Sequence, residues 1–296
     1  MRLPRISIVT PSYNHAEYIE WTVRSVLLQR YANLEYVVMD GGSKDATRDI
    51  LEPYRHRFAH FVSEKDRGQA DALARGFERT TGEIMGYLNS DDVLAPGALH
   101  FVADYFAAHP EVDALYSHRC MVNEQNRVIG YWILPPHDSH LIRRCDLIPQ
   151  ETCFWRRRLF EQAGNIDASY RFAMDYDLFV RFMDHGVLAR VNRVLGAFRV
   201  HVQSKTWLLL ATLGEEEKQR VLDRYGIKIS WLDRLRIAWA TRALRWRSSW
   251  HAKTRRLLAG ALPGVGYDYD DVWGGQLNEK RLPEVPAAAR REPVAA

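Results

Sequence analysis

The chain has 296 residues, of which 47% are hydrophobic and 26% charged, a composition typical of a folded globular protein and not of a disordered chain. The formal net charge is +4, but nine lysines and arginines stand against one aspartate between Ile227 and Gly260. That segment therefore carries +8 and the remainder −4, so the positive charge gives no reason to expect nucleic-acid binding over the body of the protein.

The N-terminal residues and the cysteines point to a protein that stays in the cell. The apolar run in MRLPRISIVTPSYN is short and ends at a proline, too short for a signal-peptide core or a membrane span. The three cysteines, Cys120, Cys145 and Cys153, lack CxxC spacing and indicate neither a disulfide framework nor a zinc site. We expect a cytoplasmic location.

Short β-rich runs alternate with helical patterns in the first third of the chain. The β-rich runs are residues 5–10, 34–40, 58–64 and 83–89. Apolar residues at helical spacing fill the stretches 16–29 and 69–80 between them. This alternation predicts an α/β fold with a mostly parallel sheet flanked by helices, in which ligands bind at the carboxyl ends of the strands.

Polar residues follow three of these predicted strands. The clusters are Thr10–Asn14, Asp40–Ser43 and Asn89–Asp92. Because the carboxyl ends of parallel strands meet at one edge of a sheet, we expect the three clusters to converge. Neither the GxGxxG nor the phosphate-loop pattern is present, so a nucleotide must be held in another way.

The segment DGGS has two explanations. Adjacent glycines let the backbone approach a ligand closely, and Asp40 offers a carboxylate to a ribose hydroxyl or a base N–H. A plain turn explains the same residues, because Asp-Gly favours turns.

The segment NSDD places two adjacent carboxylates, Asp91 and Asp92, after a predicted strand. Carboxylate oxygens suit Mg²⁺ or Mn²⁺, which can also bind the phosphates of a nucleotide diphosphate. The alternative is an Asp-rich turn that caps the helix starting near Pro96.

Farther along the chain the predicted elements are less regular. They are a helix over 96–108, strands over 113–118 and 127–134, a helix over 172–186 and a last strand over 196–201. From Thr206 the pattern is helical. Residues 276–296 are rich in proline and charge, which predicts a disordered tail.

A basic, tryptophan-rich helix is predicted within residues 231–256. One face of it carries Leu232, Leu235, Trp239, Ala243, Trp246 and Trp250, with arginines and a lysine on either side. Tryptophans flanked by cations are typical of a helix that lies in a membrane interface. The alternative is a helix docked on the rest of the chain or on a partner subunit. No segment is apolar enough to span a bilayer.

Four segments in this order and spacing resemble the nucleotide-binding half of family 2 glycosyltransferases, which have the GT-A fold. They are SIVTPSYNHAEYIEWTVRSVLLQ, YVVMDGGSKDAT, SEKDRGQADALARGF and GYLNSDDVL. The resemblance implies a GT-A catalytic domain over 1–205, which leaves a helical extension over 206–275 and the tail over 276–296. It also implies a nucleotide diphosphate sugar donor, with UDP or dTDP as the default, and Mn²⁺ or Mg²⁺ as cofactor.

The resemblance assigns roles to the polar clusters. Residues that match the base- and ribose-binding positions are Pro11, Tyr13, Asn14 and Asp40. Asp91 and Asp92 match the metal-binding acidic motif. Many members have aspartate where this chain has Asn89, so Asn89 is expected to contact the ribose or the metal through its carbonyl oxygen, and which of the two aspartates binds the metal directly stays open.

The segment MDYDLFVRF matches the helix that supplies the catalytic base in the family. Asp175 occupies the position of the base, although Met174 replaces the usual acid before it. An inverting transfer needs one carboxylate near the acceptor hydroxyl to accept its proton. The alternative for Asp175 is a helix cap, and Asp177 is expected to be a solvated or supporting charge.

Two further segments match the family's diphosphate and acceptor sides. In FRVHVQSK, Arg199, His201 and Lys205 would neutralise the leaving diphosphate, and His201 would also reach the metal; a structural histidine is the alternative. In LIPQETCFWRRRLF, sugar hydroxyls would bind Gln150, Glu151 and Thr152, and Trp155 would be a stacking surface for the acceptor. The alternative for this segment is a solvated helix start.

These predictions together describe an inverting, metal-dependent hexosyl- or deoxyhexosyltransferase on the cytoplasmic face of the membrane. It would move a sugar from a nucleotide diphosphate to a hydroxyl of a glycan acceptor, expected to be lipid-linked, in cell-surface polysaccharide synthesis. The rival interpretation is a non-catalytic nucleotide-sugar-binding subunit that recruits a partner enzyme.

Overall fold

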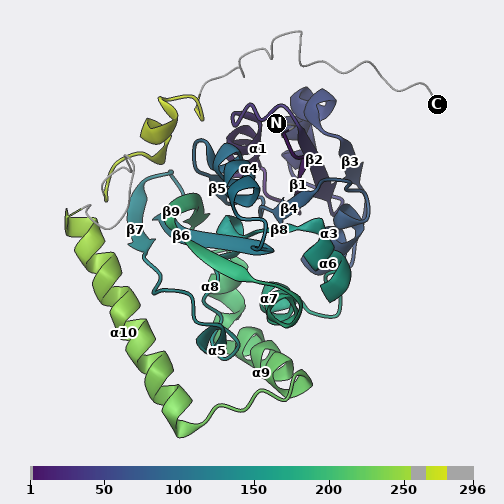
Figure 1. The fold of residues 1–296 in the computed structure, drawn as a ribbon. Coiled ribbons are helices and arrows are strands. Elements are labelled where there is room, and N and C mark those ends of the chain that lie inside the picture. Colours follow the sequence, from purple (N-terminus) through teal and green to yellow (C-terminus); the bar gives the residue numbers. More distant parts are fainter. Residues whose placement is uncertain (1–2, 255–264, 279–296) are drawn as a thin grey trace.

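A computed structural model describes residues 3–254 and 265–278. Figure 1 shows one curled sheet with helices on both of its faces. Among the described residues the strands form a mixed sheet in the order β3-β2-β1-β4-β8-β6-β9-β5, with β7 hydrogen-bonded to β6. The strands are β1 (Ile6–Ser12), β2 (Leu34–Asp40), β3 (His60–Ser63), β4 (Ile84–Tyr87), β5 (Val93–Leu94), β6 (Ala114–Val122), β7 (Val128–Trp132), β8 (Phe154–Arg156) and β9 (Leu188–Arg199).

The first four strands form the parallel half of the sheet. β1 pairs in parallel with both β2 and β4, and β2 pairs in parallel with β3. The register sets Ser12 opposite Asp40, so the chain leaves β1 and β2 at the same edge. The predicted α/β fold with a mostly parallel sheet is confirmed, and the polar clusters meet at that edge as expected.

The other strands add antiparallel pairings. β8 pairs antiparallel with β4 and β6, and β5 pairs antiparallel with β9. β9 is longer than the strand predicted over 196–201. β5 and β8 were not predicted, because strands this short cannot show the alternation of apolar and polar residues that marks a strand. The β5–β9 pair brings the end of β9 beside the loop that follows β4.

Helices cover the sheet on both faces. They are α1 (Ile19–Leu27), α2 (Thr47–Leu51), α3 (Gln69–Phe77), α4 (Ala98–Ala108), α5 (Ser139–Ile142), α6 (Arg157–Ala163), α7 (Met174–His185), α8 (Lys205–Leu209), α9 (Glu215–Arg224) and α10 (Trp231–Thr254), with short helical turns η1 (Glu52–Arg57), η2 (Gln150–Thr152), η3 (Leu210–Gly214) and η4 (Tyr269–Trp273). One core packs α1 and α4 on the sheet through residues such as Val23 and Leu99, and the other packs α3 and α7 through Phe77 and Phe182. The apolar spacing that predicted these helices is therefore the spacing that buries them.

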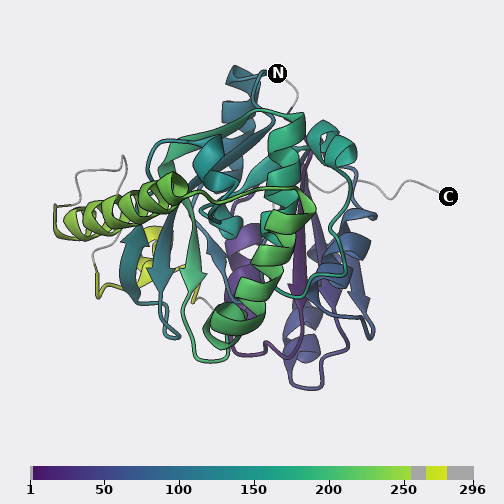
Figure 2. The same ribbon diagram turned by 90° about the horizontal axis from the view of Figure 1, so that it is seen from below.

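The last long helix, α10, lies apart from the helices that cover the sheet. It packs against β7 and α5, and Figure 2 shows it extending outward from one side of the molecule. No helix within residues 3–254 and 265–278 is long and apolar enough to cross a membrane.

Residues 265–278, which we call the C-terminal strap, return to the sheet. Tyr269, Trp273 and Leu277 are buried against β6 and β7, and the backbone of Val128 is hydrogen-bonded to Gly266 and Tyr267. Residues 276–278 of the predicted disordered tail are thus packed, and residues 279–296 lie outside the described residues.

Candidate active site

The loops after β1 and β2 are tied together at the carboxyl edge of the sheet. Asn14 has a φ of 54°; its N–H donates to Ser43 Oγ at 2.8 Å and its Oδ1 accepts from the N–H of Lys44 at 2.8 Å. Pro11 is buried inside β1, whereas Tyr13 leaves 54% of its surface exposed. Of these predicted nucleotide ligands, Tyr13 therefore presents an open aromatic ring at the edge.

Asp40 is held by serines. Its carboxylate accepts from Ser43 N–H at 3.1 Å, from Ser43 Oγ, and from Ser63 Oγ at 2.6 Å. Gly42 has a φ of +79°, which favours glycine. The turn therefore accounts for Gly42 in the DGGS segment. Asp40 stands next to the open edge of the sheet, where its carboxylate is a hydrogen-bond acceptor in a fixed position.

The two adjacent aspartates after β4 differ in environment. Asp92 is buried and accepts from the backbone N–H of Arg199 at 2.9 Å, and burial together with the negative charge of Asp91 raises the pKa of Asp92 well above its usual value. Burial opposes ionisation of Asp91 too, but the hydrogen bond from His201 and the charges of His15 and His201 lower the pKa of Asp91. Asp91 is therefore the ionised member of the pair.

Arg199 lies beneath the loop that carries these aspartates. Its side chain is fully buried and donates to the backbone oxygens of Asp91 and Asn123, each at 2.8 Å, and to Asn126 Oδ1 at 2.5 Å. The guanidinium also stacks on the rings of Tyr18 and Trp21, and burial lowers the pKa of Arg199 to about 10.

This placement corrects the role predicted for Arg199 at a leaving diphosphate. Its guanidinium is committed to the interior of the protein and does not face the open edge. Lys205, an exposed residue at the start of α8, is the cation at that edge, where its Nζ donates to Gln69 Oε1 at 2.7 Å.

His201 faces Asp91, as the prediction of a metal-site histidine requires. Its Nε2 lies 3.0 Å from Asp91 Oδ2. His15, which the sequence analysis did not single out, lies next to them: its ring centroid is 6.3 Å from that of His201, and its Nδ1 is 2.5 Å from Ser90 Oγ. The position of His15 directly after Asn14 was the signal that could have found it.

The donor set at this edge fits a divalent ion that is bound together with a nucleotide. Among the described residues no three His, Cys, Asp or Glu side chains converge to hold an ion by themselves. Asp91 and His201 supply one oxygen and one nitrogen donor. Mg²⁺ and its relatives are commonly held by one or two side chains and complete their coordination with substrate phosphates and water.

A cavity of about 280 Å³ opens beside this edge. Its lining brings together residues that the sequence analysis assigned to different roles, namely Asn89, Asp92, Gln150, Glu151, Asp175 and Lys205. Asn89 connects the start of α3 with the turn η2, because its amide group binds Gln69 at 2.6 Å and Gln150 at 3.1 Å.

Asp175 projects into the cavity from the first turn of α7. Its Oδ1 accepts from the N–H of Tyr176 at 2.9 Å, and burial raises the pKa of Asp175 to about 6. Asp146 lines the same cavity, and burial together with the charge of Asp175 raises the pKa of Asp146 to about 8. Of the three aspartates that line the cavity, Asp175 is therefore ionised at neutral pH, whereas Asp146 and Asp92 keep their protons.

Asp177, on the same helix, has a different function. It is fully buried and binds Arg181 at 3.0 Å, Arg224 at 3.2 Å and Tyr225 at 2.9 Å. It thereby docks α9 on α7, so it is a supporting charge and not a solvated one.

The predicted acceptor residues divide into two groups. Gln150 and Glu151 line the cavity. Thr152 is fully buried and bonded to the backbone of Ser117. Trp155 is fully buried among Phe77, Phe160 and Phe182.

Neither Thr152 nor Trp155 therefore has a face for an acceptor sugar, and the roles predicted for them are wrong. The alternative of a solvated helix start holds in part: Arg158 is exposed, whereas Arg156 and Arg157 are partly buried and donate to backbone carbonyls. The missed lining residues Arg119, Trp132, Asp146 and Lys218 come from the part of the chain with irregular patterns.

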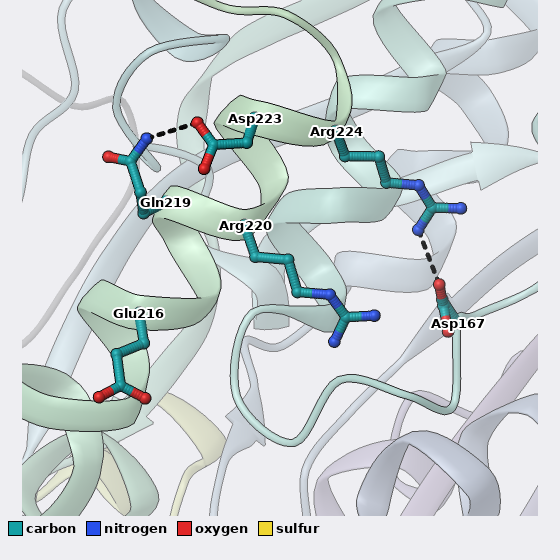
Figure 3. A pocket seen from close by; sticks show the side chains of 6 residues that line it. All are labelled: Asp167, Glu216, Gln219, Arg220, Asp223 and Arg224. Carbon is teal, nitrogen blue, oxygen red and sulfur yellow. Dashed lines mark hydrogen bonds and ion pairs between the residues drawn. The ribbon is translucent and has the colours of Figure 1, made fainter.

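A second hollow lies on the outer side of α9, away from the strand ends (Figure 3). Several of its side chains already have partners within the protein: Arg224 binds Asp167 at 2.7 Å, Arg220 binds Ser169 at 2.6 Å and Gln219 binds Asp223 at 2.8 Å. This hollow lies away from the edge where the polar clusters meet, so the cavity beside Asp175 is the candidate active site.

More than half of the chain matches a known protein family. The family described as "Glycosyl transferase family 2" matches residues 7–164. The "PGL/p-HBAD biosynthesis glycosyltransferase" of Mycobacterium tuberculosis is 30% identical over 202 residues, which cover 67% of this chain and 77% of that protein. "Chondroitin synthase" of Escherichia coli is 27% identical over 77% of this chain, which spans 34% of that larger protein.

Solved structures show the same fold. The mannosyltransferase PcManGT from Pyrobaculum calidifontis, in complex with GDP-Man and Mn²⁺, has a TM-score of 0.58 at 20% identity, over 89% of this chain and 78% of that one. Residues 1–349 of S. aureus TarS, in complex with UDP-GlcNAc, have a TM-score of 0.55 at 18% identity, over 67% of this chain and 59% of that one. At these identities the likeness concerns the GT-A fold alone.

Replacing the buried cation tests its structural role. Arg199→Met removes the partner of Asn126 and of two backbone carbonyls, so we expect the free energy of unfolding to fall by about 3–5 kcal/mol. Chemical denaturation measures it. Arg193→Met is the control, because Arg193 lies on the same strand but is exposed, and its loss should change stability by less than about 0.5 kcal/mol. Equal stabilities for the two variants would contradict the assignment.

Proposed function

The chain belongs to glycosyl transferase family 2 and is a glycosyltransferase, and from this we propose that it transfers one sugar, with inversion, from a nucleotide diphosphate sugar to a hydroxyl of a glycan acceptor. The observation that carries the proposal is the cavity in which Asp175 stands beside the edge formed by Asp91, His201 and Lys205. A role in cell-surface polysaccharide synthesis fits relatives such as the chondroitin synthase.

We place the donor at the carboxyl edge of β1, β2 and β4. The exposed ring of Tyr13 would stack on the base, and the loop of Asn14 with Asp40 would face the base and ribose. Similar structures were solved in complex with UDP, UDP-GlcNAc or GDP-Man. UDP or dTDP is the donor nucleotide that we propose for this chain.

Asp91 and His201 would hold Mn²⁺ or Mg²⁺ together with the diphosphate. We assign the metal to Asp91 and not to Asp92, because Asp92 is buried and bonded to the backbone of Arg199. The ion, when bound, supplies positive charge against the leaving diphosphate. Lys205 adds a second positive charge from the protein at the same edge.

Asp175 is the proposed base. The acceptor hydroxyl oxygen forms the new bond to C1 of the donor sugar, the bond from C1 to the phosphate oxygen breaks, and the hydroxyl proton passes to the carboxylate of Asp175. The electron pair of the broken bond leaves with the nucleoside diphosphate. Asp146, protonated near neutral pH, adds no second negative charge beside the base.

Membrane association is proposed through the exposed face of α10. Trp231, Trp239 and Trp246 leave 69%, 76% and 66% of their surfaces exposed, and Leu232 and Leu235 are exposed beside them. The opposite face docks on the protein: Leu244 is buried, and Ser248 Oγ accepts from Ile133 N–H at 3.0 Å.

Both interpretations of this helix therefore have support, a docked face and a free apolar face. An exposed face of tryptophans on a basic helix suits the interface of an anionic membrane. We take this to be the cytoplasmic face of the membrane and expect the acceptor to be lipid-linked there. Residues 255 and 256 of the predicted membrane segment lie outside the described residues.

Nucleotide binding tests the donor site. We expect UDP or dTDP to raise the melting temperature only with Mn²⁺ or Mg²⁺, whereas GDP and CMP should have less effect; a ligand at a hundredfold its Kd stabilises by about 2.7 kcal/mol. Asp91→Asn should abolish the metal-dependent part of the shift, and Asp49→Asn, at an exposed site, should keep it. If no nucleotide stabilises the protein at millimolar concentration, the proposed donor site is wrong.

Asp175→Asn separates an enzyme from a binding subunit. We expect kcat for sugar transfer to fall by about 10²–10⁴-fold, while the nucleotide-induced shift in melting temperature stays. Asp184→Asn, at an exposed position of the same helix, is the control. A non-catalytic subunit would show no transfer in the unchanged protein and no difference between these variants.

The same carboxylate predicts a pH dependence. Asp175 acts when ionised, and its pKa is raised to about 6, so kcat should fall as pH drops through 6 and be level between there and the pKa of Asp146, which is about 8. A pH profile of kcat measures this. A profile that stays flat between pH 5 and 7 would remove Asp175 from the role of base.

Vesicle binding tests the exposed face of α10. The double substitution Trp239→Ser and Trp246→Ser should lower binding to phosphatidylglycerol vesicles at least tenfold, because each buried aromatic side chain is worth about 1.5–3 kcal/mol. Cosedimentation measures the bound fraction. Ile129→Ser, at a 44% exposed residue of β7, should bind as the unchanged protein does. Unaltered binding of the tryptophan variant would contradict the proposal.

A further inference from the structure

One wall of the cavity is built from aromatic rings around a neutralised ion pair. Arg119 on β6 is set opposite Trp132 on β7. The guanidinium of Arg119 lies over the ring of Trp132 at 5.0 Å and over the ring of Phe198 at 4.6 Å. Trp132 and Phe198 both line the cavity and are only partly buried.

The charge of this wall is already satisfied inside the protein. Arg119 makes a two-point ion pair with Glu151, with Nε and Nη2 at 2.8 Å and 2.5 Å from its carboxylate oxygens. Such paired guanidinium and carboxylate groups have little left to offer a charged ligand. Arg119 and Glu151 thus line the cavity as a neutralised pair, and beside them the wall presents the apolar ring surface of Trp132 and Phe198 that the guanidinium does not cover.

The position of Trp132 is fixed from two sides. β7 is hydrogen-bonded to β6 along its length, and directly after Trp132 the N–H of Ile133 donates to Ser248 Oγ of α10 at 3.0 Å. A ring held in this way can orient a ligand without a large loss of its own freedom.

We propose that Trp132 is the platform on which the acceptor sugar stacks, and that the acceptor unit at this position is a neutral pyranose. One face of a pyranose carries C–H groups and matches an aromatic ring, while its hydroxyls lie around the rim. On this platform the sugar lies in the cavity that holds Asp175, the base of the proposed transfer, on which this inference rests. Trp132 thus takes the role that the sequence suggested for Trp155.

Saturation-transfer NMR tests the platform without need of transfer activity. The probes are the methyl β-glycosides of glucose, galactose and N-acetylglucosamine, added to the full chain with UDP and Mg²⁺, which is diamagnetic and leaves the proton signals sharp. We expect at least one probe to show saturation of the C–H protons on one ring face. Trp132→Ala and Trp132→Leu should abolish that signal, Trp132→Phe should retain part of it, and Ile129→Ala on the same strand should retain it all.

Two results would overturn the inference. One is an equal signal in the unchanged protein and in Trp132→Leu. Leucine keeps the apolar bulk without a flat ring, so this variant can be used if Trp132→Ala does not fold. The other is no signal from any of the three glycosides with the unchanged protein. Failure of the proposed glycosyl transfer appears separately, as the absence of a metal-dependent nucleotide shift in melting temperature.

Discussion

A single buried cation, Arg199, organises the region on which the active site depends. Its guanidinium ties the loop after β4 to the β6–β7 turn and to the aromatic residues of α1. Burial lowers the pKa of Arg199, and the nearby negative charges of Asp92 and Asp91 raise it again, so they help Arg199 to stay protonated. Without Arg199, the backbone oxygens of Asp91 and Asn123 and the side chain of Asn126 would lose a buried partner.

The consequence is a division of roles between two residues that are adjacent in sequence. Asp92 points inward and is bonded to the backbone of β9, while Asp91 points to the edge and meets His201. The same loop therefore has one group that holds the structure and one that is available to a ligand. The parallel half of the sheet supplies this edge, and the antiparallel strands supply the cavity wall with Arg119 and Trp132.

The parallel half was predictable from the sequence because its signals are local. Each strand has a clear apolar run, and the polar residues that follow it must lie at the strand end. The orientation of Arg199 was not predictable, because it depends on the pairing of β9 with the two residues of β5. For the same reason the burial of Trp155 was not predictable: only the pairing of β8 with β4 and β6 encloses it, and three residues of β8 are too few to show a strand pattern.

The C-terminal strap and α10 also change how the sheet meets other molecules. Within the described residues β7 pairs with β6 alone, so its outer side is an edge of the sheet. The strap bonds to that side at Val128, and α10 bonds just beyond its other end at Ile133. Open edges of this kind invite pairing between chains and aggregation. A chain shortened before α10 would therefore leave this edge strand open to pairing with other chains.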